Sequence, residues 1–242
     1  MEFILKVIIL DTEMSGSSNS DRVISIAIGE YKNGELQGLK SGLFNPGVPI
    51  TQGAFWVHKI SNDKVANKPS FKKTEFFDIL SSVFSSSENV VIGHAICNDI
   101  FMIAREGIQC KCRVIDTQHC AVTILKKTKT ALNFLSKELN LLSENEEIKF
   151  HTAEGDVIVT YHLLNELLKY NSFEELINIS MEQFYDLTIS IDRRRKQKVH
   201  LIATKDKEKL VPYFKTVKDP KLFYAMMYFY QNAELLPLVI KN

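Results

Sequence analysis

The sequence predicts an α/β fold with a mixed β-sheet flanked by helices, followed by a basic, partly helical C-terminal extension. Three observations predict it: short β-branched runs come first with a hairpin signal, later runs alternate with segments of helical periodicity, and the composition changes near residue 173. The chain has 242 residues, 45% of them hydrophobic, enough for an ordinary core. This composition excludes a disordered, collagen-like or coiled-coil chain.

Five strands are expected, each from a short apolar run. Phe3–Leu10 stops at Asp11 and has the uninterrupted apolar character of a strand buried on both faces. Val23–Ile28 and Leu36–Phe44 flank an Asn-Gly pair, which is typical of a hairpin turn. The last two expected strands are Val90–Ile92 and Val114–Ile115.

Helices are expected where apolar side chains recur every three or four residues. The four ranges are Phe71–Phe84, Asn98–Glu106, Leu132–Leu139 and about Gly155–Tyr170. Because hairpin strands come first and strands alternating with helices come later, the sheet should be mixed.

The formal net charge of +1 is the sum of two opposed parts. Ser190–Lys221 holds eleven Lys and Arg against four Asp and Glu, so the rest of the chain is net acidic. This asymmetry predicts residues 1–172 as one domain and residues 173–242 as an extension with its own role. Within the extension, Leu222–Tyr230 is rich in aromatic side chains, which are expected in the core, with base stacking as the alternative.

Cysteine usage and hydropathy predict a cytoplasmic protein with no membrane partner. Four cysteines in a chain of this length do not form a disulfide scaffold, and Cys110-Lys-Cys112 lacks the spacing of common zinc and redox motifs. Packed or free thiols in a reducing cytosol are therefore expected. Met1–Leu10 and Leu222–Ile240 are not expected to be a signal peptide or a membrane span, because charged and polar residues interrupt both.

Asp11 and Glu13 lie at the end of the first expected strand. Residues two apart in a strand point to the same face, so both carboxylates can converge on one point. Carboxylates that close repel each other unless a proton or a cation lies between them, and hard divalent ions such as Mg²⁺ prefer such oxygens. The alternative is a pair of solvated acids in a turn.

Two further acidic residues, Asp99 and Asp156, each lie at the start of an expected helix. Each one alone is explained by the preference of carboxylates for helix N-termini. His151 precedes the second helix in a loop, where an imidazole can be accessible to solvent and titrate near neutrality.

Together and in this order, these five residues resemble the three motifs of the DEDDh (DnaQ-like) 3′→5′ exonuclease family, which includes proofreading subunits of DNA polymerase, ribonuclease T, oligoribonuclease and exonuclease X. The motifs are Asp11-Thr12-Glu13, His94 five residues before Asp99, and His151 five residues before Asp156. Similar stretches extend the resemblance over roughly residues 3–170: Phe44–Gly47, Val57–Ser61, Ile115–Thr117 and Thr130–Leu141.

The resemblance implies a ribonuclease H-like fold and a two-metal-ion reaction. The metal ligands it implies are Asp11, Glu13, Asp99 and Asp156, with Asp11 between two divalent ions, Mg²⁺ or Mn²⁺. It implies His151 as the general base, a role that suits an imidazole. The expected reaction releases nucleoside 5′-monophosphates from 3′ ends.

The resemblance also implies substrate contacts. It places the 3′-terminal nucleotide on Thr12, Met14 and Ser15, and it brings His58 to the substrate from a loop. The sequence departs from the common family pattern only at positions that are neither ligand nor base: Met14, Ala95, Asn98 and Val157. Separately, the basic run with Arg193, Arg194 and Arg195 is expected to attract phosphate, with a solvated charged loop as the alternative.

The partner expected from the resemblance is a nucleic acid with a free 3′ end, with DNA preferred to RNA. The resemblance also suggests a DNA polymerase as a partner. An RNA-trimming exoribonuclease of the same family is the first alternative, because a contact to the 2′-hydroxyl would decide and the sequence shows none. The second alternative is a module that binds nucleic acid or a polymerase and has lost its chemistry. The presence of all five site residues argues against that second alternative.

Overall fold

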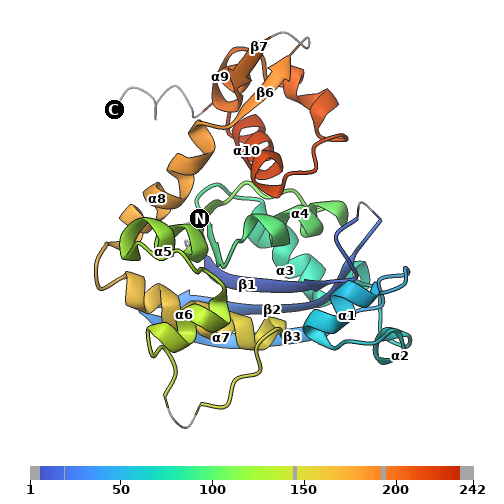
Figure 1. The fold of residues 1–242 in the computed structure, drawn as a ribbon. Helices are drawn as coiled ribbons and strands as arrows, with labels where there is room; N and C mark the ends of the chain where they lie inside the picture. Colours follow the sequence, from blue (N-terminus) through green and yellow to red (C-terminus); the bar gives the residue numbers. More distant parts are fainter. Residues whose placement is uncertain (1–5, 19, 144–145, 192–194, 235–242) are drawn as a thin grey trace, which may run out of the picture.

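The computed structural model describes residues 6–18, 20–143, 146–191 and 195–234. Its centre is a five-stranded mixed sheet in the order β3-β2-β1-β4-β5 (Figure 1). β1 pairs with β2 and β2 with β3 in antiparallel fashion, whereas β1–β4 and β4–β5 are parallel. The strands are β1 (Val7–Met14), β2 (Val23–Lys32), β3 (Glu35–Leu43), β4 (Val90–Gly93) and β5 (Arg113–Asp116). The mixed sheet is confirmed.

The expected end of the first strand at Leu10 is wrong, because its pairing with β2 continues to Met14. Asp11 and Glu13 are therefore inside β1 rather than after it. β2 is also longer than expected and reaches Lys32. The turn that follows has positive φ angles of 54° at Asn33 and 83° at Gly34, which is the conformation that an Asn-Gly hairpin turn requires.

All four expected helices form, although their ends shift. They are α3 (Glu75–Phe84), α4 (Cys97–Arg105), α6 (Leu132–Glu138) and α7 (Ala153–Leu167). The first turn of the helix expected from Phe71 is instead a separate 3₁₀ turn, η1 (Phe71–Lys73).

Three helices of the N-terminal part were not expected: α1 (Gln52–His58), α2 (Asn62–Val65) and α5 (Thr117–Leu125). The first two span at most two turns, too short for a periodic apolar pattern, and they begin at side-chain caps formed by Thr51 and Ser61. Asp116 caps α5 by accepting hydrogen bonds from the backbone N–H groups of Gln118 and His119.

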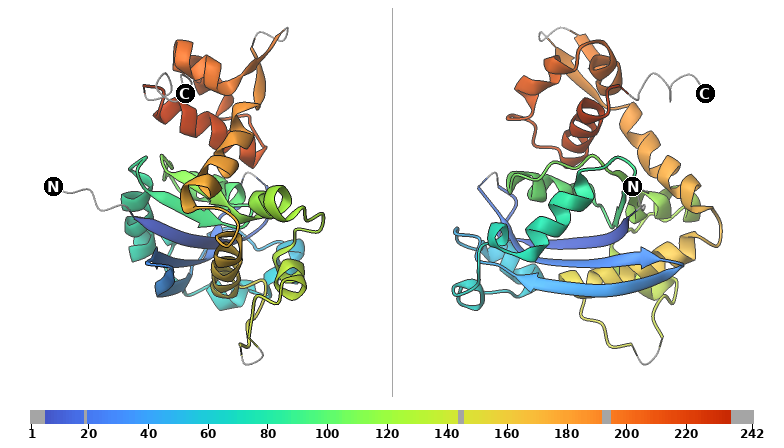
Figure 2. Two further views of the ribbon diagram at one scale, coloured as in Figure 1. Left: turned by 90° about the vertical axis from the view of Figure 1, so that its left-hand side faces the viewer. Right: turned by 180° about the vertical axis from the view of Figure 1, so that it is seen from behind.

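Helices cover both faces of the sheet. α7 packs across β1, β2 and β3 on one face, and α3 lies on the other (Figure 2). Four consecutive residues of β1, Val7 to Leu10, are buried, because its side chains meet a helix layer on either face. This arrangement brings the start of α7 to the end of β1.

The C-terminal elements lie at the β5 end of the sheet, away from β3 (Figure 1). α8 (Phe173–Tyr185) packs against β5 and α5, and α10 packs against α4. The remaining elements are β6 (Thr188–Ile191), β7 (Arg195–Lys198), α9 (Val199–Asp206), the 3₁₀ helix η2 (Lys207–Tyr213) and α10 (Pro220–Gln231).

The aromatic residues of α10 belong to the core, as expected. Tyr224 and Phe229 are fully buried, and the Tyr224 hydroxyl donates to the Cys112 carbonyl over 2.7 Å. One cluster of buried apolar side chains extends from the sheet to α10. The division of the chain after residue 172 stays a prediction.

The cysteines also match the expectation, because all four are free and buried. No helix in the described part of the chain combines the length and the apolar character that crossing a membrane requires.

Candidate active site

Three carboxylates meet where β1 faces the start of α7. Asp11 and Glu13 lie on the same face of β1, and Asp156 lies in the first turn of α7. One oxygen from each of the three lies within 4.8 Å of the other two. Because all three residues are at least partly buried, the solvated-turn alternative for Asp11 and Glu13 does not hold.

Asp99 joins this group from α4, which follows the neighbouring strand β4. Its side chain is buried, and Oδ1 accepts hydrogen bonds from the Thr12 backbone N–H (2.8 Å) and from the Thr12 hydroxyl (2.6 Å). The residue between the two β1 carboxylates is thereby tied to Asp99. A helix-terminal role alone does not explain Asp99, since its carboxylate binds a different element.

The loop before α7 places His151 beside Asp156. The His151 backbone has a positive φ of 60°, and its N–H donates to Asp156 Oδ1 over 3.3 Å. Thr152 caps α7 by accepting a hydrogen bond from the Gly155 N–H, so Asp156 does not have to serve as the cap. The His151 side chain is exposed, which leaves its imidazole accessible from solvent at the edge of the carboxylate group.

Burial raises the pKa of every carboxyl in this group, and repulsion from the neighbouring acids of the group adds to the shift at Asp11 and Glu13. Burial, followed by the charges of Asp156 and Asp99, raises the pKa of Glu13 to about 8. Burial raises the pKa of Asp99 to about 7 although hydrogen bonds from Thr12 oppose the shift. Burial and the three neighbouring acids raise the pKa of Asp11 well above its usual range. Burial also raises the pKa of Asp156, and His151 opposes that shift.

This chemistry fits a divalent metal site. Four desolvated carboxylates without a cation favour binding protons, and a hard cation would satisfy the same oxygens at neutral pH. Asp11, Glu13 and Asp156 offer oxygens close enough together to share such ions. The donor set consists only of oxygen, which is typical of Mg²⁺ and Mn²⁺ sites.

A pocket of about 350 Å³ opens beside Glu13. Thr12 and Met14 of β1 line one side, and Val57 and His58 of α1 line another. His58 is buried, and its Nδ1 accepts a hydrogen bond from the Ile60 N–H over 3.0 Å. Burial lowers the pKa of His58, although the nearby Met14 carbonyl favours the charged form.

The other residues expected at the substrate lie elsewhere. Ser15 is fully buried, and its hydroxyl donates to Asp21 over 2.7 Å, so it fastens the β1–β2 connection instead of lining the pocket. Arg193 and Arg194 lie outside the described residues. Arg195 is exposed in β7, at the β5 end of the molecule, and the described contacts do not join it to the carboxylates.

Sequence reasoning missed part of the site's surroundings. Thr51 and Gly16 line the pocket beside Glu13, and a second pocket next to it is lined by Lys64, Lys68 and Lys149. The similar stretch at residues 57–61 pointed to this region. The lysines belong to none of the motifs, although Lys149 lies only two residues before His151, because no spacing in the sequence links it to Lys64 and Lys68.

Comparison with known proteins places this geometry among exonucleases. The RNase T family of exonucleases matches residues 8–164, which contain all four carboxylates and His151. The chain is 25% identical over 199 residues to the 3′-5′ exonuclease DinG of Bacillus subtilis strain 168. That alignment covers 77% of this chain but only 21% of the relative, so the chain spans about a fifth of the length of that relative.

Solved structures show the same fold. A structure of exonuclease X in complex with 5′-overhanging duplex DNA aligns with a TM-score of 0.60 and 22% identity, covering 72% of this chain and 99% of that chain. E. coli exonuclease I in complex with a dA16 oligonucleotide aligns with a TM-score of 0.57 and 14% identity, covering 86% of this chain and 45% of that one. Since the family match covers well over half of the sequence and the site residues all fall within it, the chain belongs to the RNase T exonuclease family, on a ribonuclease H-like fold.

Proposed function

We propose that this protein is a 3′→5′ exonuclease that uses two divalent ions, Mg²⁺ or Mn²⁺, to hydrolyse the terminal phosphodiester of a nucleic acid and release nucleoside 5′-monophosphates. One observation supports the proposal most strongly: Asp11, Glu13 and Asp156 place carboxylate oxygens within 4.8 Å of one another, and the buried Asp99 lies close enough for its charge to raise the pKa values of Asp11 and Glu13. A carboxylate group of this kind is unfavourable without ions and suited to two-metal hydrolysis.

The residues of the site have different roles in the proposed reaction. Asp11, Glu13, Asp99 and Asp156 would hold the ions, which supply activation of the attacking water and stabilisation of the leaving 3′-oxygen. Thr12 fixes Asp99 relative to β1 through its two hydrogen bonds. The rigid β1 ladder therefore sets the spacing of the ligands.

His151 acts as the general base in this proposal. It accepts the proton of the attacking water at the exposed edge of the carboxylate group. Its position follows from the Thr152 cap and from the hydrogen bond of its backbone N–H to Asp156 Oδ1. A positioned base of this kind contributes about 10²–10⁴-fold to a hydrolysis rate.

The 3′-terminal nucleotide would occupy the pocket between β1 and α1. Met14 and Val57 offer apolar surface there, and Thr12 and Glu13 line the same pocket, so that it adjoins the carboxylates. DNA is the proposed substrate, because the exonuclease X and exonuclease I structures of the same fold contain DNA. A polymerase partner and a cytoplasmic location stay predictions.

The test uses 5′-labelled single-stranded DNA, duplex DNA and RNA of one sequence with Mg²⁺, Mn²⁺ or EDTA. We expect a ladder that shortens from the 3′ end with metal, with DNA degraded faster than RNA, and intact substrate in EDTA. Asp11→Asn should lose this activity, whereas Asp63→Asn, which removes an exposed acid from α2, should retain it. Cleavage that persists in EDTA or in Asp11→Asn would contradict the metal mechanism, and faster degradation of RNA would reverse the substrate assignment.

A further inference from the structure

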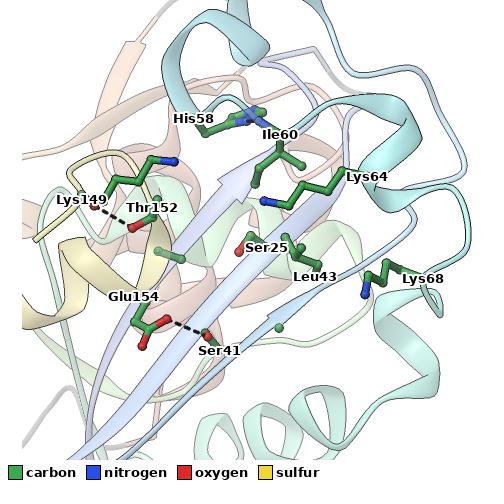
Figure 3. A pocket seen from close by; sticks show the side chains of 12 residues that line it. Ser25, Ser41, Leu43, His58, Ile60, Lys64, Lys68, Lys149, Thr152 and Glu154 are labelled. Carbon is green, nitrogen blue, oxygen red and sulfur yellow. Dashed lines mark hydrogen bonds between the residues drawn. The ribbon is translucent and has the colours of Figure 1, made fainter.

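Next to the carboxylates lies a second pocket that the proposed reaction does not use. It has a volume of about 390 Å³ and is lined by Lys64, Lys68 and Lys149, which we call the lysine pocket. Lys149 and Lys64 extend from opposite sides toward the space above Ser25 (Figure 3). The floor is formed by β2 and β3, where Ser25 and Ser41 contribute hydroxyl groups.

The charges of the lysine pocket are not balanced. None of its three lysines forms an ion pair with a carboxylate of the described residues, unlike Lys40, which pairs with Glu75 over 2.6 Å. The pocket has a single acidic residue among its lining residues, Glu154, whose carboxylate accepts a hydrogen bond from the Ser41 hydroxyl over 3.1 Å. Three ammonium groups with hydroxyls nearby suit an anion with several acceptor oxygens, such as a phosphate.

The lysine pocket adjoins the catalytic region. His58 lines both this pocket and the pocket beside Glu13. Ser25 on its floor is the direct cross-strand partner of Glu13, and neighbouring strands lie roughly 4.8 Å apart. Ala153 and Glu154, between His151 and Asp156 in the sequence, form its other wall. An extended strand whose 3′ nucleotide lies beside Met14 can therefore pass the carboxylates and continue into the lysine pocket.

We propose that the lysine pocket binds a backbone phosphate of the substrate strand on the 5′ side of the scissile linkage. The inference rests on the proposed function, because it takes the pocket beside Glu13 as the site of the terminal nucleotide. It gives this enzyme a requirement for substrate length: a strand must extend beyond its terminal nucleotides before the lysines contribute. The contact is to phosphate, so it serves DNA and RNA alike.

The test replaces Lys64, Lys68 and Lys149 together by Gln. The matched control replaces Lys32, Lys72 and Lys73, three exposed lysines that do not line the pocket, and so removes the same charge. Two substrates are compared: a single-stranded oligonucleotide, and the p-nitrophenyl ester of thymidine 5′-monophosphate, which carries the scissile phosphate and no other. We expect kcat/KM to fall at least about tenfold more on the oligonucleotide than on the ester for the pocket variant, and equally on both for the control.

A second measurement locates the phosphate. Oligonucleotides that carry one neutral methylphosphonate at successive linkages from the 3′ end are degraded by the wild type and by the pocket variant. At one linkage on the 5′ side of the scissile linkage, the methylphosphonate should slow degradation by the wild type about tenfold. The same methylphosphonate should not slow the pocket variant, because that variant already lacks the three lysines.

The outcomes separate this inference from the proposed function. Equal losses on the oligonucleotide and the ester, or the same methylphosphonate profile for both proteins, would overturn the lysine pocket while the exonuclease activity stands. A loss of the same size in the control triple variant would show a general charge effect and overturn it as well. If the wild type hydrolyses neither substrate with Mg²⁺ or Mn²⁺, the proposed function fails and the inference fails with it.

Discussion

The carboxylate group and the lysine pocket lie one strand apart and are built in opposite ways. Asp11 and Glu13 belong to the central strand of a sheet, are partly buried and repel each other. Lys64 and Lys149 come from the short helix α2 and from a loop, and both are exposed. The carboxylate group holds negative charge in fixed positions where solvent screens it poorly. The lysine pocket presents positive charge on long side chains that are exposed to solvent.

Substitutions in the two regions should therefore differ in the size of their effects. A buried carboxylate contributes through its fixed position and its cost of desolvation, so a single substitution should remove the chemistry. An exposed ammonium is screened by water and salt, so each lysine should contribute modestly and additively. The following variants test this contrast, beginning with the most severe.

Asp99→Asn should cause the largest loss of activity, about 10³-fold or more in kcat. The amide oxygen can still accept the hydrogen bonds of Thr12, so the fold should be retained while a charged ligand is removed. Single-turnover kinetics and circular dichroism measure the two properties. A loss smaller than that of the lysine triple variant would contradict the contrast between the two regions.

His151→Gln should lower kcat by about 10²-fold at neutral pH, because the proton of the attacking water then lacks an acceptor. His162→Gln is the matched control, since His162 pairs with Glu146 on the outer surface. Single-turnover rates of the two variants and of the wild type at neutral pH measure the effect. A loss in His151→Gln no larger than that in His162→Gln would contradict the role of His151 as the base.

Gly155→Ala tests a link between the two regions. A Cβ at Gly155 would lie about 2.2 Å from the carbonyl oxygen of Lys149, so the loop carrying Lys149 and His151 must move. We expect a loss of about 1–3 kcal/mol in the free energy of unfolding together with lower kcat. Gly53→Ala, whose Cβ would meet no neighbour within 4 Å, is the control for stability and should leave the free energy of unfolding unchanged. Thermal denaturation and kinetics on the same samples provide the measurement, and an unperturbed Gly155→Ala would show that the loop is not held as described.

Glu13→Gln should stabilise the metal-free protein at high pH. Burial raises the pKa of Glu13 from 4.5 to about 8, so the folded state binds a proton that the unfolded state has released. The wild type therefore loses stability as pH rises from about 5 to 9, and Glu13→Gln avoids this loss. We expect a Tm about 3 °C or more above that of the wild type at pH 9 and nearly equal values at pH 5.

Divalent metal should reverse the order of the Tm values of the wild type and Glu13→Gln at pH 9. Mg²⁺ or Mn²⁺ should raise the Tm of the wild type more at pH 9 than at pH 5, because the carboxylates bind it when charged. Glu13→Gln should gain less at either pH. Equal gains for the two proteins would argue that the ions bind outside the carboxylate group.

The single variant Lys64→Gln should have the smallest effect, about a two- to fivefold weaker affinity for single-stranded DNA. Its signature is the salt dependence: removing one phosphate contact should reduce the slope of log K against log salt by about 0.7. Lys72→Gln serves as the control, and fluorescence anisotropy over a range of KCl concentrations measures both. A larger effect at Lys72 would contradict the special place of the lysine pocket.

Much of the carboxylate site was predictable because its signals are local. The spacing of Asp11 and Glu13 follows from the two-residue period of a strand, and the positions of Asp99 and Asp156 follow from helix starts. The two expectations that changed concern environment. β1 extends through both acids to Met14 because β2 supplies pairing partners, and Ser15 is buried because Asp21 and Arg22 bind its hydroxyl.

The lysine pocket was not predictable from residue patterns. Lys149 lies far from Lys64 and Lys68 in the sequence, and α2, which contains Lys64, is too short to show a period. Their proximity depends on α2 and the loop before α7 meeting over β2 and β3, a long-range contact. Arg195, the described arginine of the basic run that stood out in the sequence, lies instead in β7, among the C-terminal elements away from β3.

Fold class, the order of the elements and the identity of the acidic residues follow from the amino-acid sequence, because period, capping and spacing are properties of neighbouring residues. The tertiary structure decides which of those acids share one site and how far burial raises their pKa values. It also decides which lysine side chains lie beside them. Desolvation and proximity arise only when β1, α4 and α7 pack together, since both depend on atoms that the sequence keeps apart.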